Sequence, residues 1–147
     1  MREKLLRSGR NKAFGLLLAT VSLASCPAIA SATDLSGCWS GYWQSCTTGH
    51  EGPLNAVFAN VGGNRYQVTF SGRFFKVFPF RYTVTLNVAS DDGKTVTLAG
   101  NSYLGRLFGT FTYRAGATAT SFNANYSSRR DSGKFVLSRS ATSSGVN

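Results

Sequence analysis

Acidic residues, and the side chains that most often bind metals or catalyse reactions, are scarce in this sequence. Its 147 residues include six acidic and 16 basic side chains, one histidine, three cysteines and one methionine. A metal centre needs three or four suitable ligands, and acid–base catalysis needs carboxylates or histidine, so this composition argues against both. Charged residues make up only 15%, which differs from the high charge of disordered chains. The length predicts one small domain, and 11 Phe and 6 Tyr predict a packed core.

The sequence also lacks an apolar run long enough to cross a membrane as a helix. The run at residues 13–24 has 12 residues, whereas a spanning helix needs about 20. It follows a basic segment, residues 2–12, and precedes the small residues Ala30-Ser31-Ala32, which is the pattern of a secretory signal peptide. We expect residues 1–32 to be removed after Ala32, leaving a secreted or periplasmic chain that starts at Thr33.

The three cysteines leave alternatives open. Leu23-Ala24-Ser25-Cys26 resembles the bacterial lipobox, in which lipidated Cys26 would anchor an envelope lipoprotein. Cys38 and Cys46 could form a disulfide in an oxidising compartment. In one straight strand their Cα atoms would lie about 26 Å apart, and a disulfide needs them within about 7 Å. They pair only if the chain doubles back near Ser40-Gly41, and otherwise stay free or bridge two molecules.

Alternating apolar and polar residues between turn signals predict an all-β domain at residues 33–140, followed by a polar flexible tail at 141–147. Residues 80–88 alternate most clearly, and the turn signal Ser90-Asp91-Asp92-Gly93 follows them. Because every connection is short, the pattern favours an eight-stranded antiparallel up-and-down β-barrel. The expected strands are 37–44, 53–60, 65–74, 79–89, 94–100, 106–114, 118–127 and 134–140.

The expected first strand lies within the sequence LSGCWSGYW, residues 35–43. Gly37 and Trp39 form a G-x-W pattern that resembles the first strand of calycin barrels, the relatives of avidin and the lipocalins. The chain from Leu35 onward is also similar to small secreted bacterial proteins beginning LSGxWxGxW, whose function is unknown to us. The calycin resemblance implies that Trp39 closes one barrel end and that a basic residue of the last strand covers it, where Arg139 stands.

Few residues of the expected mature chain suit catalysis. His50 and Glu51 lie in an expected loop, and no nucleophile motif accompanies them. Asp91, Asp92 and Asp131 fall in expected tight turns, which argues against a pair of catalytic carboxylates. We therefore expect no enzymatic activity, metal or cofactor, with a hydrolase that uses His50 as the less favoured alternative.

The segment GRFFKVFPFRY, residues 72–82, mixes aromatic and basic side chains without strict alternation. Neighbouring Phe74 and Phe75 cannot both face inward in an extended strand, so some rings are expected at the surface. Rings beside cations suit an anionic or amphipathic partner, such as an anionic envelope component, and the expected mature net charge of +6 supports this. Alternatively, the segment folds over one barrel end and closes it. The predicted surface consists of Arg73, Phe74, Phe75, Lys76, Phe78 and Arg81.

Two binding mechanisms remain open for such a barrel. An open interior would hold an apolar small molecule, whereas a solid interior would leave only the outer surface for binding. The many large inward residues favour the solid interior and hence binding at the surface. Nucleic acid is not an expected partner, because the chain carries an export signal. The residues expected to face inward are Tyr66, Phe70, Tyr82, Leu86, Phe111 and Tyr113, with Phe74, Phe75 and Phe78 at the mouth.

Overall fold

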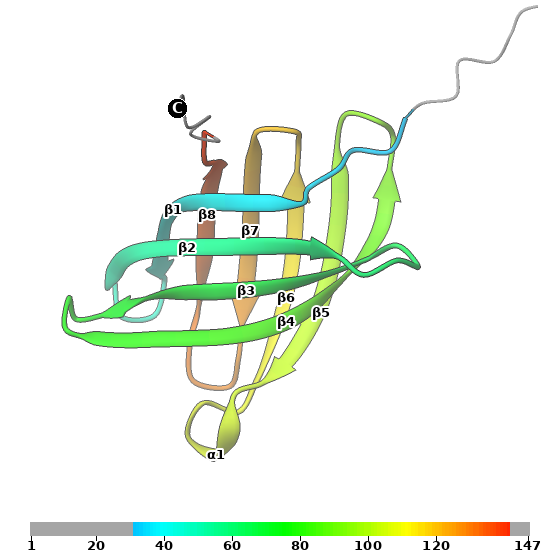
Figure 1. The fold of residues 1–147 in the computed structure, drawn as a ribbon. Coiled ribbons are helices and arrows are strands. Elements are labelled where there is room, and N and C mark those ends of the chain that lie inside the picture. Colours follow the sequence, from blue (N-terminus) through cyan, green and yellow to red (C-terminus); the bar gives the residue numbers. More distant parts are fainter. Residues whose placement is uncertain (1–30, 142–147) are drawn as a thin grey trace, which may run out of the picture.

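Eight strands, each hydrogen-bonded to the next along the chain, close into an antiparallel barrel in the computed structural model, which describes residues 31–141 (Figure 1). The prediction of an all-β, eight-stranded up-and-down barrel is confirmed. Residues 1–30, with Cys26 and most of the predicted signal peptide, and residues 142–147 of the predicted tail lie outside the described residues. The strands are β1 Gly37–Ser45, β2 Glu51–Asn60, β3 Arg65–Phe74, β4 Phe78–Asp91, β5 Val96–Tyr103, β6 Thr110–Ala117, β7 Ser121–Ser127 and β8 Ser132–Arg139.

The alternation in the sequence places one face of each strand inside the barrel. In β2, Leu54, Ala56 and Phe58 are buried while Asn55 and Val57 are exposed, as the period of two in a strand requires. The same alternation recurs around the barrel and lines its inside with apolar side chains. The hydrophobic core therefore lies within the ring of strands.

Turn residues end the strands through local hydrogen bonds. After β4, the Asp92 carboxylate accepts hydrogen bonds from the backbone N–H groups of Lys94 (2.9 Å) and Thr95 (2.7 Å). The bond from Thr95, followed by that from Lys94, lowers the pKa of Asp92 below its usual value. Asp91 binds the backbone N–H of Gly93 in the same way, at 2.8 Å. These contacts explain why the Asp-Asp-Gly signal marks a turn.

Glycines allow the strands to approach closely where the barrel curves. A Cβ on Gly41 would collide with the backbone of Val136 across the β1–β8 seam, and one on Gly133 would collide with the carbonyl of Gln44. Figure 1 shows β1–β4 crossing the direction of β5–β8 at a steep angle. Strong coiling of this kind requires glycine at a few close contacts.

Trp39 packs at one end of the barrel, against the rings of Phe58 and Phe122 at centroid distances of 5.5 and 6.5 Å. The Arg139 guanidinium lies 4.6 Å from the centre of the Trp39 ring. Gly37 has φ of +120°, a conformation that residues with a side chain rarely adopt, and it lies beside the Arg139 guanidinium. Gly37, Trp39 and Arg139 therefore lie together at this end of the barrel.

One expected strand is partly wrong. Residues 106–114 were expected to be extended, but Gly105–Phe108 form a single helical turn, α1, and β6 begins at Thr110. Gly105 and Gly109 have φ of +84° and +74°, which break the strand on either side.

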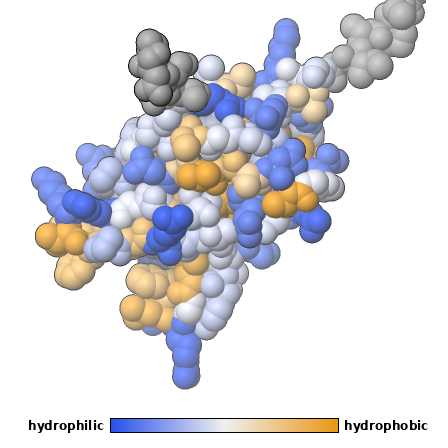
Figure 2. All heavy atoms as spheres, in the orientation of Figure 1, coloured by the Kyte–Doolittle hydropathy of each residue, from blue (hydrophilic) through white to orange (hydrophobic). Residues whose placement is uncertain are grey.

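Figure 2 shows apolar atoms gathered on two projections, at the places of α1 and of the β3–β4 hairpin tip in Figure 1. No helix within residues 31–141 is long and apolar enough to cross a membrane.

Candidate ligand-binding site

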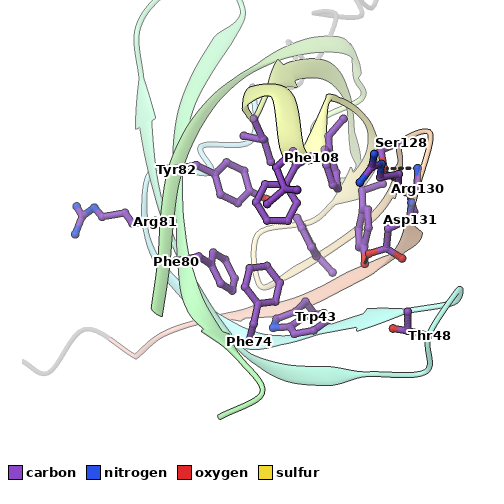
Figure 3. A pocket seen from close by; sticks show the side chains of 15 residues that line it. Trp43, Thr48, Phe74, Phe80, Arg81, Tyr82, Phe108, Ser128, Arg130 and Asp131 are labelled. Carbon is purple, nitrogen blue, oxygen red and sulfur yellow. Dashed lines mark hydrogen bonds between the residues drawn. The ribbon is translucent and has the colours of Figure 1, made fainter. Parts of the chain in front are cut away.

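The barrel interior is open at the end opposite Trp39. A cavity of about 630 Å³ lies there, bordered by the β3–β4 hairpin, α1 and the β7–β8 turn (Figure 3). Small-molecule sites commonly measure about 300–1,000 Å³. The expected solid interior is therefore wrong for this half of the barrel. The reason is that several large rings at this end lie along the wall, as Phe74 and Phe80 do at a centroid distance of 4.4 Å, and leave the centre free.

The cavity wall is mainly aromatic. Figure 3 shows Trp43 of β1, Phe74 of β3, and Phe80 and Tyr82 of β4 pointing into the space from one side. Phe135 of β8 packs against Phe70 and Tyr113, at centroid distances of 5.1 and 6.1 Å, where the open half meets the packed core. The remaining lining residues are Thr48, Arg81, Leu104, Leu107, Phe108, Phe111, Tyr126, Ser128, Arg130 and Asp131.

Two tyrosine hydroxyls place a neutral polar group on this apolar wall. The Tyr113 hydroxyl donates a hydrogen bond to the Tyr82 hydroxyl at 3.3 Å. Burial raises the pKa of both tyrosines, and the neighbouring Tyr113 raises that of Tyr82 further, so both stay protonated at neutral pH. The Tyr82 proton is then available to a ligand that carries a hydrogen-bond acceptor.

A second polar group is held at the rim. The Asp131 carboxylate accepts hydrogen bonds from the Ser45 hydroxyl at 2.6 Å and from the Tyr126 hydroxyl at 3.0 Å. Burial, followed by the Asp131 charge, raises the pKa of Tyr126. Ser128 shapes the turn, because its hydroxyl accepts hydrogen bonds from the backbone N–H groups of Arg130 (3.3 Å, dashed in Figure 3) and Asp131 (3.0 Å). The hydroxyls of Ser45 and Tyr126 therefore orient the Asp131 carboxylate at the edge of the cavity.

Trp43 lines the cavity, and within residues 31–141 its indole N–H is a hydrogen-bond donor without an acceptor. Its indole Nε1 is buried and has no hydrogen-bond partner among the residues that the structure describes. The indole lies so close to Gly52 that a Cβ on that residue would come within 2.8 Å of Nε1. An unpaired buried N–H costs stability, so the wall of the cavity is not optimised for stability alone.

The predicted surface residues are divided between the cavity and the outside of the molecule. Phe74 points into the cavity, whereas Phe75 and Phe78 are exposed on the hairpin tip. Arg73 and Lys76 are also exposed, and Arg81 borders the cavity but extends away from it (Figure 3). The hairpin projects beyond the barrel end and does not fold over it (Figure 1).

The residues expected inside the barrel do face inward, but at different depths. Tyr82 and Phe111 line the cavity. Phe70, Leu86 and Tyr113 are buried in the core, and so is Tyr66, whose hydroxyl accepts a hydrogen bond from the backbone N–H of Leu35 at 3.2 Å. Sequence reasoning did not assign Trp43, Phe80, Phe108, Tyr126 or Phe135 to a ligand site. Alternation with Tyr82 marks Phe80 as inward, but no sequence pattern shows that the space beside it is open.

The remaining candidates lie outside this cavity. His50 is exposed in the β1–β2 hairpin, with its ring 4.8 Å from that of Phe75. Cys38 and Cys46 are both exposed and free, near the two ends of β1, so the disulfide left open by the sequence is not formed between them. Within residues 31–141, no three His, Cys, Asp or Glu side chains are grouped closely enough to hold a metal ion.

Comparisons with models of protein families, with curated proteins and with solved structures found no match to this chain. A proposal about its function therefore depends on the geometry of the site.

Proposed function

We propose that this protein is a binding protein and not an enzyme, and that it holds an apolar or amphipathic small molecule in the open half of the barrel. The observation that carries the proposal is the 630 Å³ cavity with its largely aromatic wall. Apolar walls with a few polar groups are typical of small-molecule sites, because burial supplies affinity and the polar groups orient the ligand.

The wall indicates what kind of ligand fits. Trp43, Phe74 and Phe80 offer flat surfaces, so we expect planar or hydrocarbon groups to pack there. The Tyr82 hydroxyl would donate to one acceptor on the buried part of the ligand. Arg130 and Asp131 border the cavity where it opens to solvent, so a polar group of the ligand would lie beside them.

Binding of the neutral probe N-phenyl-1-naphthylamine tests this proposal. The chain from Ser31 onward suits the experiment, because all eight strands of the closed barrel lie within it. The fluorescence of the probe rises in apolar surroundings, so we expect a saturable increase with the wild-type barrel. Phe80→Glu should weaken binding about tenfold or more, because an ionised carboxylate in the cavity loses its hydration when the probe fills the space.

Val57→Glu is the matched control. Val57 is exposed on the outer face of β2, so the same charge there should leave probe binding unchanged. Circular dichroism would check that both variants keep the fold. Absence of saturable binding to the wild type, or equal losses in the two variants, would contradict the proposal.

A further inference from the structure

Two projections beside the mouth expose apolar side chains. At the tip of the β3–β4 hairpin, Phe75, Val77 and Phe78 are 63%, 68% and 64% exposed. On α1, Leu107 is 66% exposed and Phe108 also faces solvent in part. Residues of both segments border the same cavity, so the projections flank one opening. Gathered apolar exposure of this kind on a small soluble domain marks an interaction surface.

The conformation of the hairpin tip supports a role beyond folding. Phe75 and Lys76 have φ of +50° and +63°, a left-handed conformation that residues with a large side chain adopt at a steric cost. Asn-Gly is the pair that favours two such residues in a tight hairpin. The chain instead places a ring and a cation at these two positions of the exposed tip. Strain at an exposed apolar tip is typical of a functional segment.

Charge is distributed unevenly between the two barrel ends. Seven of the 11 basic side chains within residues 31–141 lie toward the mouth by their strand and loop positions. Two of the five acidic side chains lie there too, which gives a local net charge of +5. Three basic and three acidic side chains balance at the closed end. The mouth carries Arg73, Lys76, Arg81, Arg106, Arg129, Arg130 and Lys134 with Glu51 and Asp131. The closed end carries Arg65, Lys94 and Arg139 with Asp34, Asp91 and Asp92.

We propose that the mouth of the barrel docks on a lipid bilayer that contains anionic phospholipids. The rings of the hairpin tip and α1 enter the headgroup region, and the basic side chains beside them contact the phosphates. Aromatic and aliphatic side chains next to Arg and Lys are the combination that binds such interfaces. In this orientation the cavity opens toward the membrane, where apolar molecules concentrate. The docking does not depend on which ligand the cavity holds.

Co-sedimentation with vesicles tests the docking. The chain from Ser31 onward excludes the predicted signal-peptide core, which would bind lipid by itself. We expect it to sediment with vesicles of mixed phosphatidylcholine and phosphatidylglycerol, and to be released by salt, which screens surface charge. Pure phosphatidylcholine vesicles should retain much less. Arg73→Gln with Lys76→Gln and Arg106→Gln should weaken binding about tenfold or more, and Phe75→Ser with Phe78→Ser should also weaken it.

Matched controls come from the rest of the barrel. Arg65→Gln with Lys94→Gln and Arg114→Gln removes the same charge away from the mouth, and Val57→Ser with Val61→Ser removes exposed apolar side chains elsewhere. Both controls should bind vesicles as the wild type does. The proposal is overturned if the wild type ignores anionic vesicles, as a surface made for a protein partner would, or if the controls lose as much binding as the mouth variants.

The same samples separate this proposal from the cavity function. None of the residues changed in the two mouth variants lines the cavity, so their binding of N-phenyl-1-naphthylamine should equal that of the wild type. Normal probe binding without vesicle binding by the wild type would contradict the docking alone. Vesicle binding without probe binding would contradict the cavity function alone.

Discussion

Arg139 shows how one side chain organises the closed end of the barrel. Its Nε donates a hydrogen bond to the carbonyl of Ala119 at 2.7 Å, and its two Nη groups donate to the carbonyls of Ser36 and Asp34 at 2.6 Å each. The guanidinium also covers the Trp39 ring. The Arg139 guanidinium therefore links the N-terminal segment and the β6–β7 turn to the Trp39 ring of the core.

Replacing Arg139 should destabilise the fold. Arg139→Ala removes three charge-assisted hydrogen bonds, and because the group is partly exposed we expect a loss of about 2–3 kcal/mol in the free energy of unfolding. Arg139→Lys should recover only part of it, since an ammonium cannot reach three carbonyls in one plane. Urea denaturation measures both. The control Arg114→Ala, at an exposed position in β6, should change the value by less than about 0.5 kcal/mol, and an equal loss there would contradict this role.

Among the elements, the β3–β4 hairpin combines a strained turn with an exposed apolar tip. The turn is closed by the backbone N–H of Val77, which donates to the carbonyl of Phe74 at 3.1 Å. Between them stand the two left-handed residues, Phe75 and Lys76. Stability alone would favour other residues at both positions.

Phe75→Asn with Lys76→Gly should therefore stabilise the protein while weakening its binding to anionic vesicles. Relief of the left-handed strain predicts a gain of about 1 kcal/mol in the free energy of unfolding, read from the midpoint of urea denaturation. Phe78→Ser, which removes a ring without changing the left-handed residues, should give no such gain. A destabilised double variant would show that the native residues are preferred at the turn for packing.

Across the whole molecule, the barrel divides into a tightly packed end and an end that holds an open cavity. Phe58 lies in the packed half, with ring centroids of Trp39 at 5.5 Å and Phe122 at 5.1 Å. Phe80 lies in the open half and borders the cavity. The free energy of packing is thus concentrated away from the opening, which leaves the mouth free to expose apolar surface.

Truncation of the two rings should measure this division. Phe58→Ala creates a new cavity in the packed half and should cost about 3–5 kcal/mol of stability. Phe80→Ala enlarges a space that already exists, so its cost should be less than half as large. Urea denaturation of the two variants gives the comparison. Equal costs would mean that Phe80 is packed as tightly as Phe58 and does not border an open cavity.

The period-two alternation and the Asp-Gly and Gly-Gly turns were enough to predict eight strands, their order and the inward positions, because these features depend on local backbone geometry. Arg139 lies over Trp39 because β1 and β8 pair at these two residues, which are far apart in the sequence. The free Cys38 and Cys46, the turn α1 and the open half of the barrel were decided by tertiary structure. An inward ring such as Phe80 can either fill the centre or lie along the wall, and the choice depends on neighbours across the barrel that are distant in sequence.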